Sequence, residues 1–574
     1  MRVIVLLALC GCPWVDDATR AALVDRDGDG VTDAAFGGDD CDASDASIGA
    51  PDPVSAYSDG DGDGYASDGA IATSGCPGTG GVPARGDCDD ADVRVHPGAP
   101  ENCLAAIDSN CDGAVGGVVC SADGLTSVVM GIDDGLPIVG SEFPYALSVL
   151  DVDGDGLPEV VASAPYDVFL VAGFSAETLR VPGDHFLDEA VFRFQAVHSQ
   201  LGAALASADV VGDATPDLLV GCPSSEIGAA AGEGAYVLAI ELPAAGRETE
   251  ADAVLYGVQG DGFFGQSVVR VGEVDGAESV VVGAIYEGGG GAAWLSAGPW
   301  PERAATPVDA LESVRLSVPD NDDGSGARFG IAATTLRTEA GPLLALGGHE
   351  AYSGVLVGGA VALWVPGYDE TDVRLSPESG VGRYGAVGGE FFGYAMVSWD
   401  DDGDGLDSLV VGAPLAFGQD FNVGAVYVYH QPDTLLGWKA HDADLVFLGD
   451  DYNDSLDDSP FFGGAVVNAG DMNGDGLADL AMGAPNAHGV THEPQAGAVY
   501  IAPGGIADAE WDVEEVTWAR YGDRGGLHVG ELLAGGSDLD GDGRADLVVG
   551  MPGWTAPDGG GEIGAFAIWW GDLL

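Results

Sequence analysis

One pattern recurs seven times along most of this sequence, at intervals of 58 to 71 residues. Each copy has a short apolar run ending in Gly-Ala-Pro or a variant, then a variable loop and a second apolar run such as VGAVYVYH. A period of this length, made of short strands and turns, is typical of a β-propeller with one four-stranded blade per repeat. The GAP-like ends are ASAP (162–165), VGCP (220–223), VGAI (282–285), LGGH (346–349), VGAP (411–414), MGAP (482–485) and VGMP (549–552).

The two ends of the repeat region predict how the ring closes. The last repeat ends on GEIGAFAIWW, the third strand of a blade, and leaves no residues for an outer strand. SVVMG at 127–131 precedes the first repeat and matches the outer-strand sequence AVLYG at 253–257. We therefore predict an all-β, seven-bladed propeller over 123–574 whose N-terminal strand completes the last blade and removes two exposed edges. The near absence of a 3.6-residue period excludes stacked helices.

Five repeats carry an acidic loop before the GAP-like run, with oxygen-bearing side chains at positions 1, 5 and 9 and, in four of the five, at position 3. These carboxylates would repel one another unless a cation lay between them. Ca²⁺ takes about six to eight oxygens, and position 7 supplies a backbone carbonyl. The alternative is an Asp/Gly turn closed by side-chain hydrogen bonds without an ion. The predicted ligands are Asp151, Asp153, Asp155, Leu157 and Glu159; Asp209, Asp213 and Asp217; Asp400, Asp402, Asp404 and Leu406; Asp471, Asn473, Asp475, Leu477 and Asp479; and Asp538, Asp540, Asp542, Arg544 and Asp546.

The five loops are unequal. The loop at Asp209 has Val211 at position 3, so it binds weakly or not at all, and the loop at Asp400 has Ser408 at position 9 with Asp407 beside it. Repeats three and four have lost the ligands and are expected to be metal-free. An EF-hand would need a bidentate Glu at position 12, which here lies in an apolar strand, so an EF-hand is excluded. The loops contain no His or Cys, which argues against zinc or copper there.

Residues 25–122 differ in character and form a predicted loop-rich module. Six cysteines between positions 41 and 120 indicate a disulfide framework in an exported chain, with its connectivity left open. They are Cys41, Cys76, Cys88, Cys103, Cys111 and Cys120. Cys222 lies in an apolar run and is expected to be a buried thiol. Two further acidic loops are predicted to bind metal through Asp25, Asp27, Asp29 and Asp33, and through Asp59, Asp61 and Asp63.

The N-terminus MRVIVLLALCGCPW resembles a bacterial lipoprotein signal peptide over 1–12, followed by a linker over 13–24. That resemblance implies acylation of Cys12, with Cys10 as a second candidate and plain secretion as the alternative. No other apolar run approaches the ~20 residues of a spanning helix. We therefore expect an extracytoplasmic protein, either a lipoprotein of the bacterial outer membrane or cell surface or a secreted protein, that meets the membrane only through a lipid anchor.

The charge balance limits the partners. The chain has 19 basic and 94 acidic residues, for a net charge of -75. Because attraction to nucleic acids and anionic membranes comes from Lys and Arg, nucleic-acid binding is excluded. Polyvalent cations and basic ligands are the natural partners, and we expect a monomer.

The order FG, DxDGDGxxD, GAP, VYV resembles the FG-GAP repeat of integrin α-subunit propellers and of many bacterial surface proteins, over about 123–574. The N-terminal runs GDDCDASD, GDCDDAD, PGAPENC and DSNCDG resemble the Asp/Cys-rich metal-binding motif of bacterial cell-surface proteins, one of which binds copper. That resemblance implies metal binding, and the carboxylate ligands favour Ca²⁺. His96 is the only candidate copper ligand of the segment.

Two functions remain open at this stage. The first is a calcium-binding surface or secreted protein whose propeller binds protein or carbohydrate without catalysis, at loops on one face as the integrin resemblance implies. The second is a polysaccharide lyase or hydrolase, since some lyases resemble FG-GAP propellers. Such an enzyme needs a base and a group that neutralises a uronate, for example His185, His198 and Arg193 from separate loops. The histidines form no motif, which favours the first function.

Overall fold

The computed structural model describes part of the chain. The chain divides into two compact units, 1–119 and 120–574. Within the first, the described strand β1 (Ser55–Ser58) pairs antiparallel with β2 (Thr73–Ser74) and β3 (Gly81–Val82). The described residues are 55–58, 73–74, 81–82, 128–130, 132–133, 136–137, 143–152, 156–164, 169–179, 184–186, 190–196, 201–223, 236–240, 246–248, 251–258, 262–318, 327–350, 359–375, 383–384, 391–417, 422–430, 442–449, 459–489, 494–507, 509–513, 518–555 and 563–571.

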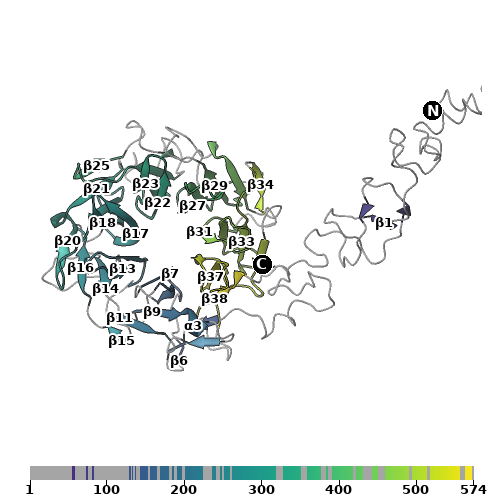
Figure 1. The fold of residues 1–574 in the computed structure, drawn as a ribbon, viewed down its shortest axis with the longest axis horizontal. Helices are drawn as coiled ribbons and strands as arrows, with labels where there is room; N and C mark the ends of the chain where they lie inside the picture. Colours follow the sequence, from purple (N-terminus) through teal and green to yellow (C-terminus); the bar gives the residue numbers. More distant parts are fainter. Residues whose placement is uncertain are drawn as a thin grey trace, which may run out of the picture. The chain divides into compact units, whose positions relative to one another are not determined.

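Seven sheets, each with four antiparallel strands, surround a central axis in the second unit and form the blades of a propeller (Figure 1). The prediction of an all-β, seven-bladed fold is confirmed. From the innermost strand outward, the blades are β7 (Leu147–Leu150), β8 (Glu159–Ala164), β9 (Phe169–Ser175), β11 (Phe192–Ala196); β12 (Leu205–Ala208), β13 (Asp217–Cys222), β14 (Tyr236–Ile240), β16 (Ala253–Tyr256); β17 (Phe264–Val274), β18 (Ala277–Ala284), β19 (Ala292–Ala297), β21 (Ser313–Ser317); β22 (Ala332–Thr338), β23 (Gly341–Gly348), β24 (Ala360–Trp364), β26 (Arg383–Tyr384); β27 (Ala395–Trp399), β28 (Ser408–Ala413), β29 (Ala425–Tyr429), β30 (Leu445–Leu448); β31 (Ala465–Gly470), β32 (Asp479–Ala484), β33 (Ala498–Ala502), β35 (Trp518–Tyr521); and β36 (Leu533–Ser537), β37 (Asp546–Met551), β38 (Ala565–Trp569), β4 (Val128–Met130).

The N-terminal strand closes the ring, as the sequence predicts. Strand β4 pairs antiparallel with β38, the third strand of the last blade, with Val129 opposite Phe566. The first and last blades meet at their inner strands, since β7 packs against β36. One blade thus contains residues from both ends of the propeller, which leaves no open edge between them.

The core lies between the blades. The second strands β8, β13, β28, β32 and β37 are buried at every position, because each is covered on both faces by neighbouring blades. Their apolar runs therefore lack the polar/apolar alternation of a half-exposed strand. One apolar cluster joins the last blade to the first. In it, the ring centroid of Phe566 lies 5.7 Å from that of Phe174 and 6.1 Å from that of Phe143.

A glycine-to-glycine contact between blades explains why the repeat needs both FG and GAP. A Cβ added to Gly412 in β28 would lie 2.0 Å from the carbonyl oxygen of Gly463, the FG glycine of the next blade. The same contact occurs at four other blade boundaries, where the added Cβ would lie 2.0 to 2.2 Å from the oxygen. In the first repeat Ser163 takes this place, and its Oγ donates a hydrogen bond to the carbonyl of Gly202 at 2.8 Å. The other four pairs are Gly221 with Gly265, Gly283 with Gly330, Gly347 with Gly393, and Gly483 with Gly530.

A fifth strand, which the sequence does not predict, extends five of the blades. In each case the segment before the fourth strand of one blade pairs in parallel with the fourth strand of the preceding blade. These backbone pairs link neighbouring blades at their outer edges. The fifth strands are β10 (Asp184–Phe186), β15 (Gly246–Glu248), β20 (Ala305–Pro307), β25 (Asp372–Arg374) and β34 (Glu510–Asp512).

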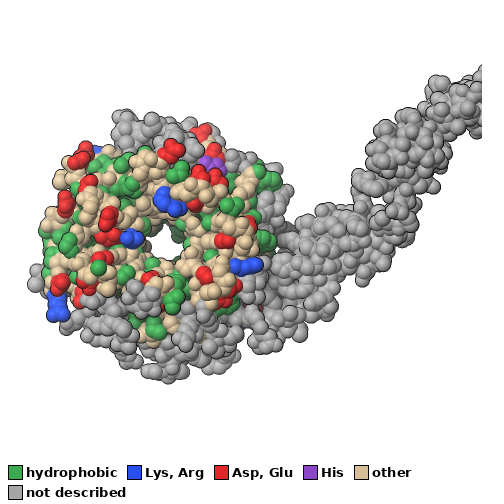
Figure 2. Space-filling model, in the orientation of Figure 1, with side chains coloured by type: hydrophobic (Ala, Val, Ile, Leu, Met, Phe, Trp, Pro, Cys, Tyr) green, Lys and Arg blue, Asp and Glu red, His purple; other side chains and the backbone are tan. Residues whose placement is uncertain are grey.

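The described part of the propeller also contains four short elements outside the blades. They are the strands β5 (Ile132–Asp133) and β6 (Leu136–Pro137), the single-turn helix α3 (Ala176–Leu179) and the 3₁₀ turn η3 (Val308–Ala310). The helices described here include none with the length and apolarity needed to span a bilayer. Figure 2 shows acidic side chains spread over the face in view, with Lys or Arg side chains beside the central opening and at the outer edge.

Candidate metal centres in the acidic loops

The acidic loops connect the first and second strands of blades one, two, five, six and seven. In blades three and four a two-residue turn takes the place of the loop, Asp275-Gly276 and Glu339-Ala340 respectively. A turn of two residues has no room for four ligands around an ion. The expectation that these two blades lack the metal loop therefore agrees with the described backbone.

The loop of blade six shows the shared conformation most fully. The Asp471 carboxylate accepts hydrogen bonds from the backbone N–H groups of Gly474, Asp475 and Gly476, at 2.7, 3.0 and 2.9 Å. Both glycines have positive φ, 79° and 91°, a conformation that glycine adopts without steric cost. The chain therefore wraps around the first carboxylate, and the side chains of Asn473 and Asp475 are held on the same short loop.

The carboxylate at position 9 fixes the base of the loop. Asp479 is the first residue of β32 and is fully buried. Its Oδ2 accepts hydrogen bonds from the N–H groups of Met472 and Asn473, at 2.9 and 3.2 Å, and its Oδ1 accepts one from Gly504 at 3.2 Å. Position 9 therefore shapes the loop whether or not an ion is bound.

The other loops repeat this arrangement. Asp546 in blade seven and Asp217 in blade two accept the position-2 N–H at 2.7 and 2.8 Å, and Glu159 in blade one does so at 3.2 Å. The loop of blade two keeps the conformation although Val211 replaces a ligand and Ala214, at position 6, has φ of 76°. A non-glycine residue rarely adopts such a φ, so this backbone is retained despite a local cost.

The loop of blade five is the described loop whose carboxylates most clearly favour a bound cation. Oxygens of Asp400, Asp402 and Asp404 lie within 4.8 Å of one another. The Oδ1 atom of Asp400 is buried and has no hydrogen-bond partner among the described residues. A buried carboxylate oxygen without a partner is costly, and a bound cation would remove that cost. Asp538, Asp540 and Asp542 of blade seven form a second group of this kind.

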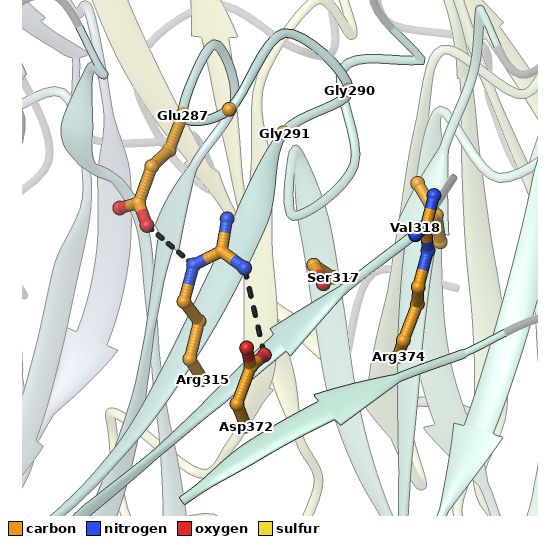
Figure 3. Close-up of a pocket in the computed structure, with 9 residues that line it drawn as sticks. Glu287, Gly290, Gly291, Arg315, Ser317, Val318, Asp372 and Arg374 are labelled. Carbon is orange, nitrogen blue, oxygen red and sulfur yellow. Dashed lines mark hydrogen bonds and ion pairs between the residues drawn. The ribbon is translucent and has the colours of Figure 1, made fainter. Parts of the chain in front are cut away.

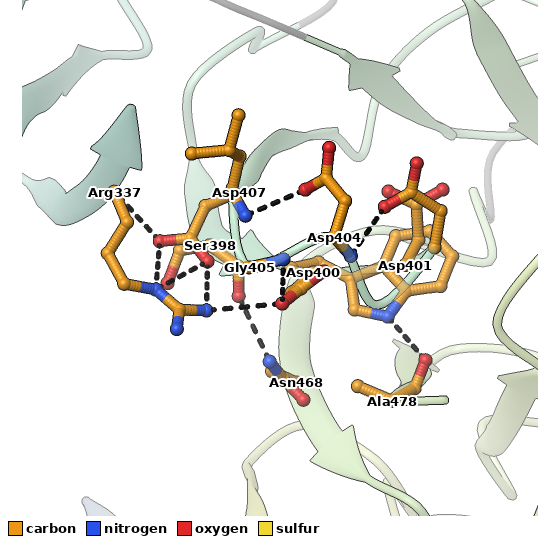
Figure 4. Close-up of polar contacts among 12 residues, drawn as sticks. Arg337, Ser398, Asp400, Asp401, Asp404, Gly405, Asp407, Asn468 and Ala478 are labelled. Atoms are coloured by element: carbon orange, nitrogen blue, oxygen red, sulfur yellow. Dashed lines mark hydrogen bonds and ion pairs between the residues drawn. The ribbon is translucent and has the colours of Figure 1, made fainter. Parts of the chain in front are cut away.

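An arginine from the preceding blade occupies the side of this loop (Figure 4). Arg337 at the end of β22 contacts Asp407 with its Nη2 2.6 Å from Oδ1, and lies 3.6 Å from Asp400. Asp407 is buried and also accepts the backbone N–H of Arg337 at 2.6 Å. Asp407 is therefore engaged by Arg337, and Ser408 at position 9 instead donates its hydroxyl to Asp401 at 2.7 Å.

The buried carboxylates disfavour their own ionisation. Burial is the largest cause that raises the pKa of Asp546 to about 7, and the nearby Asp540 and Asp538 carboxylates contribute to that rise. Burial likewise raises the pKa of Asp217 and of Asp479 to about 6. A pKa raised on folding means that the ionised loop loses stability as the pH rises towards neutrality. A bound cation would reverse this effect, because it favours the ionised form.

Neighbouring loops touch one another across the blade boundaries. The Arg544 side chain lies beside Gly474, with Nε 3.3 Å from where a Cβ would be, and the side chain of Leu477 lies similarly close to Gly403. The N–H of Ala545 donates to the carbonyl of Asp471 at 2.9 Å. An ion that orders one loop would therefore also support the next loop.

The donor set fits a hard divalent cation. The described ligand candidates offer carboxylate, amide and backbone carbonyl oxygens and no nitrogen or sulfur, which suits Ca²⁺. The N–H of each position-7 residue donates to the position-5 carboxylate in blades five, six and seven, at 2.8 Å in each case. The sequence did not indicate Arg337, because it comes from a blade that has lost its own acidic loop.

Several predicted residues lie outside the described part of the chain or are only partly described. Cys222 is fully buried in β13, as expected. His185 and Arg193 belong to β10 and β11, on the outer strands of two different blades. The residues outside the described part are Cys12, Asp25, Asp27, Asp29, Asp33, Asp59, Asp61, Asp63, His96, Asp153, Asp155, His198 and the six N-terminal cysteines Cys41, Cys76, Cys88, Cys103, Cys111 and Cys120.

Family models match both regions of the chain. The FG-GAP repeat matches 143–175, 462–501 and 529–569, which cover the first three strands of blades one, six and seven except for Ala502 at the end of β33. A metal-binding motif of the Cu-binding MopE type matches 87–116, outside the described residues.

The similar proteins of known identity include integrin α subunits. Integrin alpha-PS5 of Drosophila melanogaster is 37% identical over 172 residues, which is 29% of this chain and 16% of the fly protein. Integrin alpha-5 of Xenopus laevis is 35% identical and integrin alpha-8 of Homo sapiens 33% identical, each over 168 residues, 28% of this chain and 14% of the relative. The matched segment thus spans about a sixth of the length of these relatives.

A solved chain titled "Crystal structure of BBS1N in complex with ARL6DN, soaked with lead" covers 76% of this chain and 93% of its own length. Its identity is 12% and its TM-score 0.34, and a score this low establishes no shared fold. The chain therefore contains FG-GAP repeats folded as a seven-bladed propeller, shares sequence with integrin α subunits, and carries a metal-binding motif of the MopE type near its N-terminus.

Proposed function

We propose that this chain is an extracytoplasmic, calcium-stabilised module whose propeller binds a protein or carbohydrate ligand without catalysing a reaction on it. The buried, unpartnered Oδ1 of Asp400, grouped with Asp402 and Asp404, is the observation that carries the calcium role. The sequence similarity to integrin α subunits and the MopE-type motif support a surface binding or adhesion role.

Calcium acts structurally in this proposal. Without an ion, the carboxylates of each loop repel one another. A bound ion links the loop to the residue at the start of the buried second strand, so its binding free energy adds to the stability of the fold. The ligands are those predicted above in blades one, five, six and seven, with the loop of blade two as the weakest site because Val211 supplies no side-chain oxygen.

Calcium stoichiometry tests the site assignment. Calcium-45 equilibrium dialysis of the full chain is compared with the double variant Asp538→Asn and Asp542→Asn, and with Asp275→Asn in the blade-three turn as the matched control. We expect the double variant to lose one bound ion and the control to lose none. Equal numbers of bound ions in all three proteins would refute the assignment of the blade-seven loop.

The lipid anchor is a separate part of the proposal. We expect labelled palmitate to be incorporated by a bacterial host that expresses the full chain, and Cys12→Ser to abolish the label while Cys10→Ser keeps it. Incorporation that survives Cys12→Ser would exclude Cys12 as the acylated residue. Secretion of the unlabelled wild-type chain would favour plain export.

A further inference from the structure

A polar cavity lies at the outer strands of blade three, and none of the acidic-loop residues lines it. Its volume is about 240 Å³, and it is lined by the Glu287–Gly291 turn, by Arg315, Ser317 and Val318, and by Asp372 and Arg374. Strand β25 belongs to the blade-four segment of the chain but pairs with β21 of blade three, so the cavity depends on the fifth-strand pairing. In this register Arg315 lies opposite Asp372 and Ser317 opposite Arg374, which places these four residues on one face of the sheet.

In one half of the cavity, Arg315 is paired with two carboxylates, Glu287 and Asp372. Arg315 Nε lies 2.6 Å from Oε1 of Glu287, and its Nη1 lies 3.5 Å from Asp372. Glu287 is only 2% exposed, and its second oxygen accepts the indole N–H of Trp294 at 2.8 Å. These contacts fix the orientation of the Arg315 guanidinium, so little side-chain entropy is lost if a ligand meets it.

In the other half, two side-chain donors have no partner among the described residues. Among the described residues Arg374 forms no ion pair or hydrogen bond, and the Ser317 hydroxyl forms no hydrogen bond. Figure 3 shows Arg374 and Val318 together at one side of the cavity, Glu287, Arg315 and Asp372 at the other, and Ser317 between them. In a chain with 19 basic and 94 acidic residues, two arginines at one cavity are unusual.

We propose that this cavity binds a small polyhydroxy carboxylate, of the size of a sugar acid. The carboxylate pairs with Arg374 and accepts a hydrogen bond from Ser317, because a guanidinium is the side chain best suited to hold a carboxylate through two parallel bonds. Asp372 lies at the opposite end, where it repels a second carboxylate but accepts a hydrogen bond from a ligand hydroxyl. The volume suits a single sugar ring, below the range of about 300–1,000 Å³ for larger ligands.

This inference rests on the proposed function, because it assigns a pocket and a ligand class to the propeller as a binding module. Isothermal titration of the full chain in calcium and physiological salt compares D-glucuronate with D-glucose, which differs from it by the carboxylate. We expect glucuronate to bind and glucose to bind much more weakly or not at all. Arg374→Gln should weaken glucuronate binding by about tenfold or more, and Ser317→Ala by a smaller factor.

The matched control is Arg270→Gln, which removes an exposed arginine of the same blade; Arg270 pairs with Glu278, and neither residue lines the cavity. It should leave the affinity unchanged. Equal binding of glucose, no binding of glucuronate at millimolar concentration, or unchanged affinity in Arg374→Gln would overturn the proposal. Calcium-dependent stability is measured on the same samples. If stability depends on calcium but glucuronate fails to bind, the pocket assignment is wrong and the calcium role stands. If glucuronate binds but stability does not depend on calcium, only the calcium role is refuted.

Discussion

Gly483, the glycine of MGAP in blade six, has no room for a side chain, and its replacement by alanine is expected to destabilise the propeller strongly. The new Cβ would lie 2.0 Å from the carbonyl oxygen of Gly530 and 3.0 Å from its carbonyl carbon. Gly530 cannot simply move, because its N–H donates to the carbonyl of Gly550 at 3.2 Å. The obstacle is backbone of the next blade and not the end of a flexible side chain.

The magnitude follows from this geometry. Real Cβ atoms approach no neighbour closer than about 3 Å, so two packed blades must separate locally by about 1 Å. Overpacking of a rigid core costs about 1–3 kcal/mol, and the upper end applies when backbone must shift. Gly→Ala also removes freedom from the unfolded chain, which offsets only about 0.4–1 kcal/mol. We therefore expect Gly483→Ala to lower the free energy of unfolding by about 2 kcal/mol.

Urea unfolding followed by tryptophan fluorescence, with calcium present, measures the effect. The control is Gly367→Ala, since Gly367 has no neighbour within 4 Å of an added Cβ and no positive φ. The control should be neutral or slightly stabilising. If the Gly483→Ala midpoint equals that of the wild type or of the control at similar slope, the close packing of FG and GAP glycines does not hold the blades together.

Three smaller effects can be measured in the same way. Burial lowers the pKa of His349 to about 4, so the folded state keeps this histidine neutral at pH values where the unfolded chain already protonates it. The free energy of unfolding should therefore fall by about 3 kcal/mol in total as the pH drops from about 6.5 towards 4. His349→Phe should flatten the pH profile of stability over that interval, and an unchanged profile would contradict the assignment. Arg337→Gln leaves the buried Asp407 without its bidentate partner and should cost about 2 kcal/mol, and a second substitution, Asp407→Asn, should recover part of that loss; a silent Arg337→Gln would show that the pair contributes nothing. Ser163→Ala removes the hydrogen bond to the carbonyl of Gly202 and should lower the free energy of unfolding by about 1 kcal/mol, which urea unfolding measures; an unchanged free energy would mean that water replaces the hydroxyl.

The repeat architecture could be predicted from the sequence because its signals are local. Apolar second strands, turn glycines and the strand at 127–131 each carry a pattern of a few residues, and their order specifies seven blades and the closing pair. The fifth strands could not be predicted. β25 and β34 have the sequences DVR and EWD, and their pairing is made by backbone atoms of segments distant in sequence from their partners.

The candidate sites, too, could be predicted only where their residues lie close together in the sequence. The alternation of oxygen-bearing residues in one short loop predicts the shared loop conformation, which the described loops of blades two, five, six and seven display. The pairing of Arg337 with Asp407 joins residues 70 positions apart, and the cavity beside Arg374 needs the register of two blades. Such groupings depend on tertiary structure, so no spacing in the sequence indicates them.

The central claim is that calcium in the acidic loops stabilises the propeller, and chelation tests it most directly. Thermal unfolding of the full chain is followed by circular dichroism with calcium, after removal of calcium by chelator, and after addition of calcium or magnesium. The account predicts a large, reversible fall in the midpoint on chelation, which calcium restores better than magnesium. An unchanged midpoint would mean that the loops fold through their own hydrogen bonds alone, and the calcium role would be wrong.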